Sequence, residues 1–106
     1  SKSELNHHLT EGSVYPLVAG SGKILLAYSE SKTKLIKEIE KKGYVYTAEE
    51  RLKNIASVAI PIFNSKNKFC GVLNVSGWKE YFNKKQIMNY VKILNHNQNI
   101  LRKIIN

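Results

Sequence analysis

The sequence predicts an α+β fold in which a small antiparallel sheet has a long C-terminal helix packed on one face. The observations behind this prediction are a β-hairpin pattern over residues 55–77 and a helical apolar stripe beyond residue 83. The 106 residues suit one domain, and 42% hydrophobic with 24% charged residues is the composition of an ordinary globular protein. Disorder of the whole chain is therefore excluded.

Irregular structure is expected at the start of the chain. Residues 1–12 show no sustained periodicity and few large apolar side chains, which is typical of a poorly ordered start or of a linker remnant. Residues 13–19 predict a short strand, in which Pro16 lacks a backbone donor and so favours a sheet edge. The domain is therefore expected to cover residues 13–106.

Two helices and a second strand are expected next. The glycines at positions 20 and 22 should end the first strand, and helix-forming residues follow from Lys23. Over residues 33–42 the apolar residues recur at helical spacing, and Gly43 stands where a left-handed C-cap is wanted. Residues 44–46 then predict a short strand, followed by a charged connection.

The hairpin is the most clearly specified element. Residues 55–63 are rich in strand formers, residues 64–68 have turn chemistry, and residues 69–77 predict the returning strand. An even number of turn residues would place Ser57 opposite Asn74 or Ser76. Small polar side chains would then share one sheet face, which is either a pocket for a small polar molecule or a solvated surface.

The last helix begins with a capping pattern at Asn83 and Gln86 and runs almost to the end of the chain. One of its faces is apolar, which is typical of a helix docked on a sheet; its residues are Ile87, Val91, Leu94, Leu101 and Ile105. Three or four short strands barely make a self-sufficient sheet, so we expect a partner edge, a dimer or residues upstream of Ser1.

The net charge of +9 would attract nucleic acid or another polyanion. Only Arg51 and Arg102 are arginines, however, and base-edge recognition favours arginine, so a general lysine bias explains the charge equally well. Every acidic residue is a glutamate, which excludes sites that need aspartate, such as EF-hand loops. The single Cys70 and the lack of a signal peptide or long apolar run indicate a cytoplasmic protein with no membrane partner.

Few residues form a recognisable catalytic or metal-binding pattern. The GSGK motif at 20–23 departs from a Walker A loop at Leu17 and Ile24, although its amides remain able to bind an anion. The histidines have no cysteine partners at metal-ligand spacing, so neither a metal nor another cofactor is expected. Cys70 is interpreted as a small buried hydrophobe rather than a reactive thiol.

Three segments, taken in order, resemble the effector-binding domain of the isocitrate lyase regulator (IclR) family of transcription regulators. They are PLVAGSGKILLA at 16–27, KKGYVYTAEE at 41–50 and IASVAIPIFNSKNKFCGVLNVSG at 55–77, and the resemblance extends over residues 16–105. The resemblance implies a GAF-like fold that binds a small and often anionic effector, and it implies assembly into homodimers or homotetramers. It also implies that the effector controls DNA binding by a winged helix-turn-helix domain, which is absent from this chain.

The resemblance also nominates the ligand-binding residues. Gly20 and Ser21 correspond to backbone donors at the helix start, and the side chains implied are those of Thr47, Ser57, Asn74 and Ser76. Three of these residues differ from those that the family has at the same positions. Thr47 replaces an acidic residue, Ser57 replaces a cysteine and Asn74 replaces a serine. The helix and loop that the family has before its Gly-Tyr segment, and its first GAF strands, are missing, which indicates a truncated or reduced domain.

We therefore expect a non-enzymatic effector-sensing domain. The alternatives are a basic nucleic-acid-binding module, suggested by Lys84, Lys85, Lys92 and Lys103, and a dimerisation domain with a degenerate pocket. A thiol enzyme built on Cys70 is a further alternative and requires a lowered thiol pKa.

Overall fold

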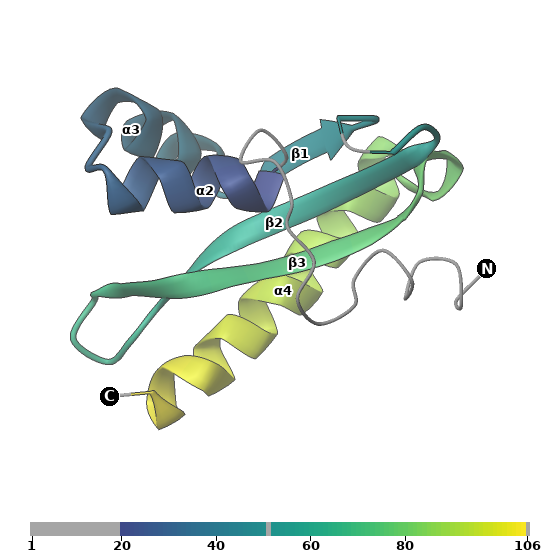
Figure 1. Cartoon of the computed structure of the whole chain (residues 1–106). Coiled ribbons are helices and arrows are strands. Elements are labelled where there is room, and N and C mark those ends of the chain that lie inside the picture. The colour runs from purple at the N-terminus through teal and green to yellow at the C-terminus, as the bar shows by residue number, and fades with distance from the viewer. Residues whose placement is uncertain (1–19, 51, 106) are drawn as a thin grey trace.

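A three-stranded antiparallel sheet lies between two helical layers in the computed structural model, which describes residues 20–50 and 52–105 (Figure 1). Helix α4 covers one face, and helices α2 and α3 lie on the other. The element bounds are α2 Gly20–Ser29, α3 Thr33–Lys42, β1 Val45–Ala48, β2 Ile55–Phe63, β3 Phe69–Trp78, η1 Lys79–Tyr81 and α4 Lys84–Ile104. The predicted α+β class and the long C-terminal helix are confirmed. The irregular start and the strand at 13–19 lie outside the described residues.

Helix α2 begins earlier than the sequence pattern indicated. Its first residue is Gly20, so the glycines form the first helical turn instead of a turn before Lys23. Gly20 and Gly22 are buried, as are Ile24 and Ala27, because this side of α2 lies on the sheet. Small residues let the helix backbone approach the strands closely, and that packing outweighs the low helix propensity of glycine.

Helix α3 ends as predicted. Gly43 has φ of 88°, and its N–H donates to the carbonyl of Ile39 over 2.7 Å. This left-handed cap turns the chain into β1, which begins at Val45 and extends to Ala48. The strand is therefore shifted by one residue at its start and longer at its end than the predicted 44–46, and it includes Thr47.

The hairpin of β2 and β3 is confirmed, with a turn of five residues at 64–68. An odd turn alone would move Ser57 away from Ser76, but a β-bulge restores the pairing. Ile62 pairs with Gly71 and Phe63 with Phe69, which leaves Cys70 as the extra residue. Cys70 is exposed, so its interpretation as a buried hydrophobe was wrong.

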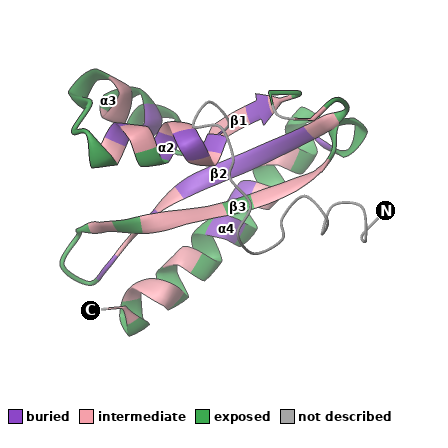
Figure 2. Ribbon diagram, in the orientation of Figure 1, coloured by how far each residue is buried: buried purple, intermediate pink, exposed green. Residues whose placement is uncertain are grey.

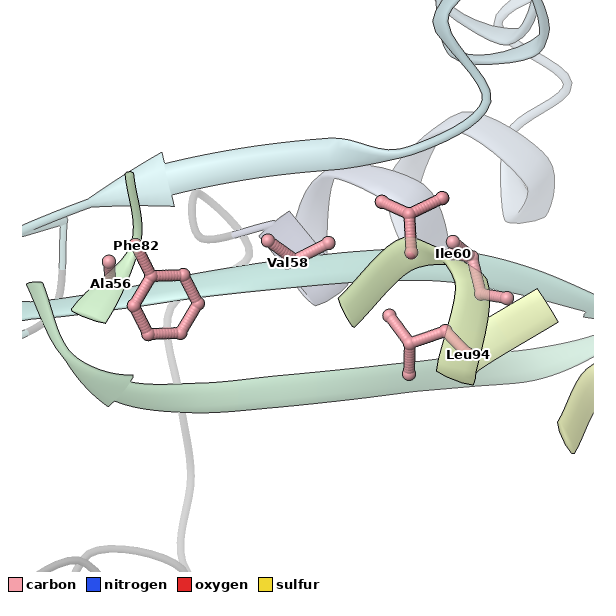
Figure 3. Close-up of a cluster of buried hydrophobic side chains, with 6 residues drawn as sticks. Ala56, Val58, Ile60, Phe82 and Leu94 are labelled. Carbon is pink, nitrogen blue, oxygen red and sulfur yellow. The ribbon is translucent and has the colours of Figure 1, made fainter. Parts of the chain in front are cut away.

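Strand β2 is the central strand and is buried on both faces (Figure 2). On the α4 side, buried residues of β2, α4 and the preceding loop form one cluster (Figure 3): Ala56, Val58, Ile60, Phe82, Val91 and Leu94. On the α2 side a second cluster contains Ile24, Ala27, Ile39 and Ala59. Successive side chains of β2 alternate between the two clusters, which explains why a nearly continuous apolar run forms this strand.

Tyr28 closes the α2 side of the core near the hairpin turn. Its ring stacks on Phe69 with centroids 4.6 Å apart and meets Phe63 edge-on. Burial, together with the charge of Glu40, raises the pKa of the Tyr28 hydroxyl above its ordinary value of 10.0. The phenol is therefore neutral at physiological pH.

Helix α4 begins with the predicted cap. The Asn83 side chain accepts a hydrogen bond from the Gln86 backbone N–H at 2.8 Å. Val91 and Leu94 of the predicted apolar stripe are buried, and Ile87 packs against the same cluster. In Figure 1 the helix passes behind β2 and β3, and its end lies near the β2–β3 turn, where the Ser65 N–H donates to the Ile105 carbonyl.

Candidate ligand site

Three hydroxyl groups lie in a row across the sheet on the α2 side. Thr47 of β1 pairs with Ser57 of β2, and Ser57 pairs in turn with Ser76 of β3. The oxygens of Thr47 and Ser57 are 2.8 Å apart, and both side chains are buried. Because one hydroxyl donates to the other, the pair retains one O–H group that is free to donate to a third partner.

Asn74 extends this polar row toward the surface. It is two residues from Ser76 on β3, and its side-chain amide donates to the Ser76 oxygen at 2.7 Å. Ser76 therefore accepts one hydrogen bond and still has its own hydrogen to donate. Asn74 itself is exposed, so it lies at the edge of the polar row and not inside it.

The start of α2 lies directly over Ser57. A Cβ atom placed on Gly20 would lie 3.6 Å from the Ser57 oxygen and 3.5 Å from the carbonyl of Val45. Those are ordinary contact distances, so alanine fits at position 20 but a larger side chain meets the polar row. Ser21 is half-buried and is not among the described residues that line the adjacent cavity.

A cavity of about 20 Å³ lies beside the row of hydroxyls. Its described lining residues are Thr47, Glu50, Leu52, Ile55, Ala56, Ser57 and Ser76. This volume holds roughly one water molecule, whereas small-molecule pockets measure roughly 300 Å³ or more. The structure therefore shows this site closed, with its polar groups bonded to one another.

The loop between β1 and β2 covers the cavity and is fixed by Glu49. The Glu49 carboxylate accepts from the Asn54 backbone N–H at 3.1 Å and lies 3.8 Å from the Lys79 amine. Glu49 and Asn54 have φ of 59° and 64°. Left-handed backbone is unfavourable for a residue such as glutamate, so contacts hold this loop rather than its own preference. They include backbone hydrogen bonds from the Glu49 N–H to the Ile55 carbonyl and from the Lys79 N–H to the Asn54 carbonyl, both at 2.8 Å.

One ion pair lies at the rim of the site. Lys23 of α2 contacts Glu50 at 3.1 Å, and both side chains are partly exposed. This pair joins the first turn of α2 to the loop that covers the cavity. An exposed pair of this kind contributes little to stability, so this ion pair alone opposes separation of the loop from α2 only weakly.

Five of the six nominated residues lie close together: Gly20, Thr47, Ser57, Asn74 and Ser76. Ser21 follows Gly20 in the first turn of α2, and it is not among the described residues that line the cavity. The loop residues of the cavity were not nominated from the sequence. Ile55 could have been predicted from the sequence, because it is two residues from Ser57 in the same strand and therefore lies on the same face. Glu50 and Leu52 could not, because no periodic pattern indicates how an irregular loop folds over a sheet.

Other possible sites are weaker. Two larger hollows among the described residues, of about 660 and 390 Å³, are open to solvent and do not include the buried hydroxyls. Among the described residues no group of three or more His, Cys, Asp or Glu side chains is placed to hold a metal ion. Within the same part of the chain, no helix combines the length and apolarity needed to cross a membrane.

The sequence and the fold match one class of regulator. The family model described as the bacterial transcriptional regulator IclR C-terminal domain matches residues 30–100, which is more than half of the chain. The chain therefore belongs to the IclR family. No curated protein sequence matches it.

Solved structures of the same family share the fold. The repressor BlcR of Agobacterium tumefaciens superimposes with a TM-score of 0.77 at 15% identity, covering 94% of this chain and 51% of BlcR. The inducer-binding domain of PobR from Acinetobacter, as a double mutant with 3-hydroxybenzoic acid, gives 0.75 at 18% identity, covering 92% and 71%. An IclR-family regulator from Rhodococcus sp. gives 0.72 at 18% identity, covering 86% and 44%. The chain thus spans about half the length of two of these three proteins.

Proposed function

We propose that this chain is the effector-sensing domain of an IclR-type transcription regulator and binds a small polar or anionic metabolite. The observation that supports it is the buried row of hydroxyls beneath the start of α2, in a family of transcription regulators. Ligand binding by Gly20, Ser21, Thr47, Ser57, Asn74 and Ser76 is part of this proposal. PobR, a neighbour in structure, holds a hydroxybenzoic acid.

The chemistry of the site favours an acceptor-rich ligand. The row of hydroxyls has O–H groups that are free to donate to a ligand. The backbone N–H groups in the first turn of a helix such as α2 have no acceptor within the helix, and Lys23 lies at the rim of the site. Donors and a positive helix end attract carboxylates or hydroxyl-bearing acids. No acidic side chain other than Glu50 lines the described part of the cavity.

Binding requires the closed site to open. Leu52 and Glu50 belong to the loop that covers the cavity. Among the described residues, the Lys23–Glu50 ion pair ties that part of the loop to α2. An open form is a minor population without ligand, and a ligand that binds only this form shifts the equilibrium toward it. That shift is the signal passed to attached domains.

The proposal includes the setting of the domain. It acts as part of a cytoplasmic, non-enzymatic regulator without a cofactor, whose winged helix-turn-helix domain binds DNA. Copies of the domain associate as a homodimer or homotetramer, so that a ligand-induced change in one domain alters the spacing of two DNA-binding heads.

Thermal unfolding against a ligand panel tests the proposal. The panel contains hydroxybenzoates, aliphatic carboxylic acids, sugars and a short DNA duplex, at fixed salt. A ligand at a hundred times its dissociation constant should raise the unfolding free energy by about 2.7 kcal/mol, which is a clear shift in melting temperature. Gly20→Val and Ser76→Ala should abolish the shift, and Ser65→Ala, in the exposed hairpin turn, should retain it.

The outcomes separate the candidates. Saturable stabilisation by one acid class, lost in Gly20→Val, supports the sensor. No stabilisation by any member of the panel would refute it and favour a dimerisation domain whose pocket is degenerate, for which the cavity of about 20 Å³ is the supporting observation.

A second candidate function is nucleic-acid binding through α4. Lys84, Lys85, Lys92 and Lys103 are exposed, and α4 contains no acidic residue. This function predicts duplex affinity that falls steeply with salt, because each phosphate contact releases a counterion. Stabilisation by DNA alone would favour it over the sensor.

A further inference from the structure

Helix α4 has a second apolar stripe that the sheet does not cover. Ile93, Ile100 and Ile104 are 55%, 45% and 69% exposed, although isoleucine is among the side chains most often buried. They lie on the flank of the helix next to the sheet-facing side. Asn97 lies between Ile93 and Ile100 on this flank. Tyr90 lies on the same flank one turn before Ile93, and its half-buried ring also packs against Phe82.

The spacing of this stripe is that of a coiled-coil contact. Tyr90, Ile93, Asn97, Ile100 and Ile104 are separated alternately by three and four residues, which corresponds to positions a, d, a, d and a of a heptad. We call these five residues the α4 seam. It extends along about 21 Å of helix at 1.5 Å per residue.

We propose that the α4 seam is the contact surface for a second copy of this chain, with the two α4 helices parallel. The contact is then isologous, since the same patch serves both copies around a two-fold axis. The proposal does not depend on the ligand site, and it names a surface that the sensing function leaves undefined.

The charges of α4 favour a second copy over other occupants. The heptad places Lys84, Lys85, Lys92 and Arg102 away from the seam, and only Lys103 borders it. An acidic protein partner would be expected to meet lysines or arginines beside its contact stripe, and the α4 seam is flanked mainly by Asn89 and His96 instead. Two copies can therefore approach along the seam without placing lysines opposite one another.

Asn97 gives the contact its direction. Its side-chain amide now donates to the Ile93 carbonyl of the same helix at 2.8 Å. In a parallel pair each Asn97 lies opposite its counterpart, and the two amides can bond, whereas an antiparallel pair places it opposite isoleucine. A lipid surface would leave this amide in an apolar layer without such a counterpart.

Sedimentation equilibrium of the full chain without ligand, over a wide concentration range, tests the proposal. The chain should form dimers, and Ile93→Lys with Ile100→Lys should raise the dissociation constant by roughly a hundredfold or more. Both residues are about half exposed, so the folded monomer should tolerate lysine there. Met88→Lys is the matched control, because Met88 is 42% exposed on α4 but lies off the seam and should leave the dimer intact.

Added salt distinguishes this contact from an electrostatic one. It should tighten the dimer, because the two chains each carry a net charge of +9 and repel one another. Monomers at every concentration, or equal effects of the seam and Met88 variants, would overturn the proposal. So would a monomer that binds vesicles of anionic phospholipid through the same isoleucines.

The parallel arrangement has its own test. In a Cys70→Ser background, Asn97→Cys should give a disulfide-linked dimer under mild oxidation, and Met88→Cys should not. A dimer that fails to crosslink through position 97 would overturn the parallel arrangement.

Discussion

Thr47 and Ser57 bond to each other at the centre of the sheet, and neither residue was predicted to have a protein partner. The sequence indicated a polar face because small hydroxyl and amide side chains alternate with apolar ones along the strands. It did not indicate that the polar side chains of this face would hydrogen-bond to one another. That depends on the position of β1, which contributes Thr47, and on the approach of Gly20 to Ser57.

Replacing Thr47 by valine should lower the unfolding free energy by about 1–2 kcal/mol, because Ser57 then keeps a buried hydroxyl without its partner. Urea or thermal unfolding measures the change. The double variant Thr47→Val, Ser57→Ala should recover part of the loss, since both ends of the hydrogen bond are then apolar. Losses that simply add in the double variant would show that the two hydroxyls do not interact.

At the level of elements, the hairpin shows why a correct register does not require a correct turn. The predicted cross-strand pairing of Ser57 with Ser76 is confirmed. It results from a turn of five residues together with a bulge at Cys70, and not from a turn with an even number of residues. Asn64 stabilises this turn, because its side-chain oxygen accepts from the backbone N–H groups of Lys66 and Lys68, both at 2.9 Å. Alternation identifies the faces of a strand, whereas a single inserted residue leaves no periodic trace.

The start of α2 was harder to predict than the end of α3. Gly43 identified the end of α3 because a left-handed cap has a strong residue preference. The start of α2 was misplaced, since glycine usually interrupts helices and only the contact with the sheet makes it suitable there. Loop residues Glu50 and Leu52 were missed for the same reason, as their place depends on tertiary contacts.

The first turn of α4 offers a stabilising change. Lys84 and Lys85 are exposed at the N-terminal end, where the helix dipole disfavours positive charge, and the turn has no acidic residue. Lys84→Glu with Lys85→Glu should raise the unfolding free energy by about 0.3–1 kcal/mol per substitution. Thermal unfolding at low salt measures the gain, and Lys92→Glu, in the middle of α4, should give a smaller one.

For the whole molecule, the predicted α+β class is confirmed, and the second helical layer was not anticipated. The sequence pattern identified α3 as amphipathic, but the side on which α2 and α3 cover the sheet follows only from the chain path. The resemblance to the IclR family supplied the identity of the domain, and the family match over residues 30–100 confirms it.

The excess positive charge predicts how stability depends on ionic strength. With 17 basic and 8 acidic residues, self-repulsion opposes the compact state and is screened by salt. The melting temperature should therefore rise between low and moderate sodium chloride. The increase should be smaller in the Lys84→Glu, Lys85→Glu variant, whose net charge is lower by four; a melting temperature that falls with salt would contradict this.

In the proposed function, the closed cavity determines how fast the domain can respond to its effector. A site that admits one water molecule cannot be entered by diffusion alone, so association waits for the β1–β2 loop to leave Ser57 and Ser76 uncovered. The observed binding rate then reaches a plateau as ligand concentration rises, and the plateau equals the opening rate. In the proposed function, the timing of the response is then a property of the Glu49-anchored loop and not of the metabolite.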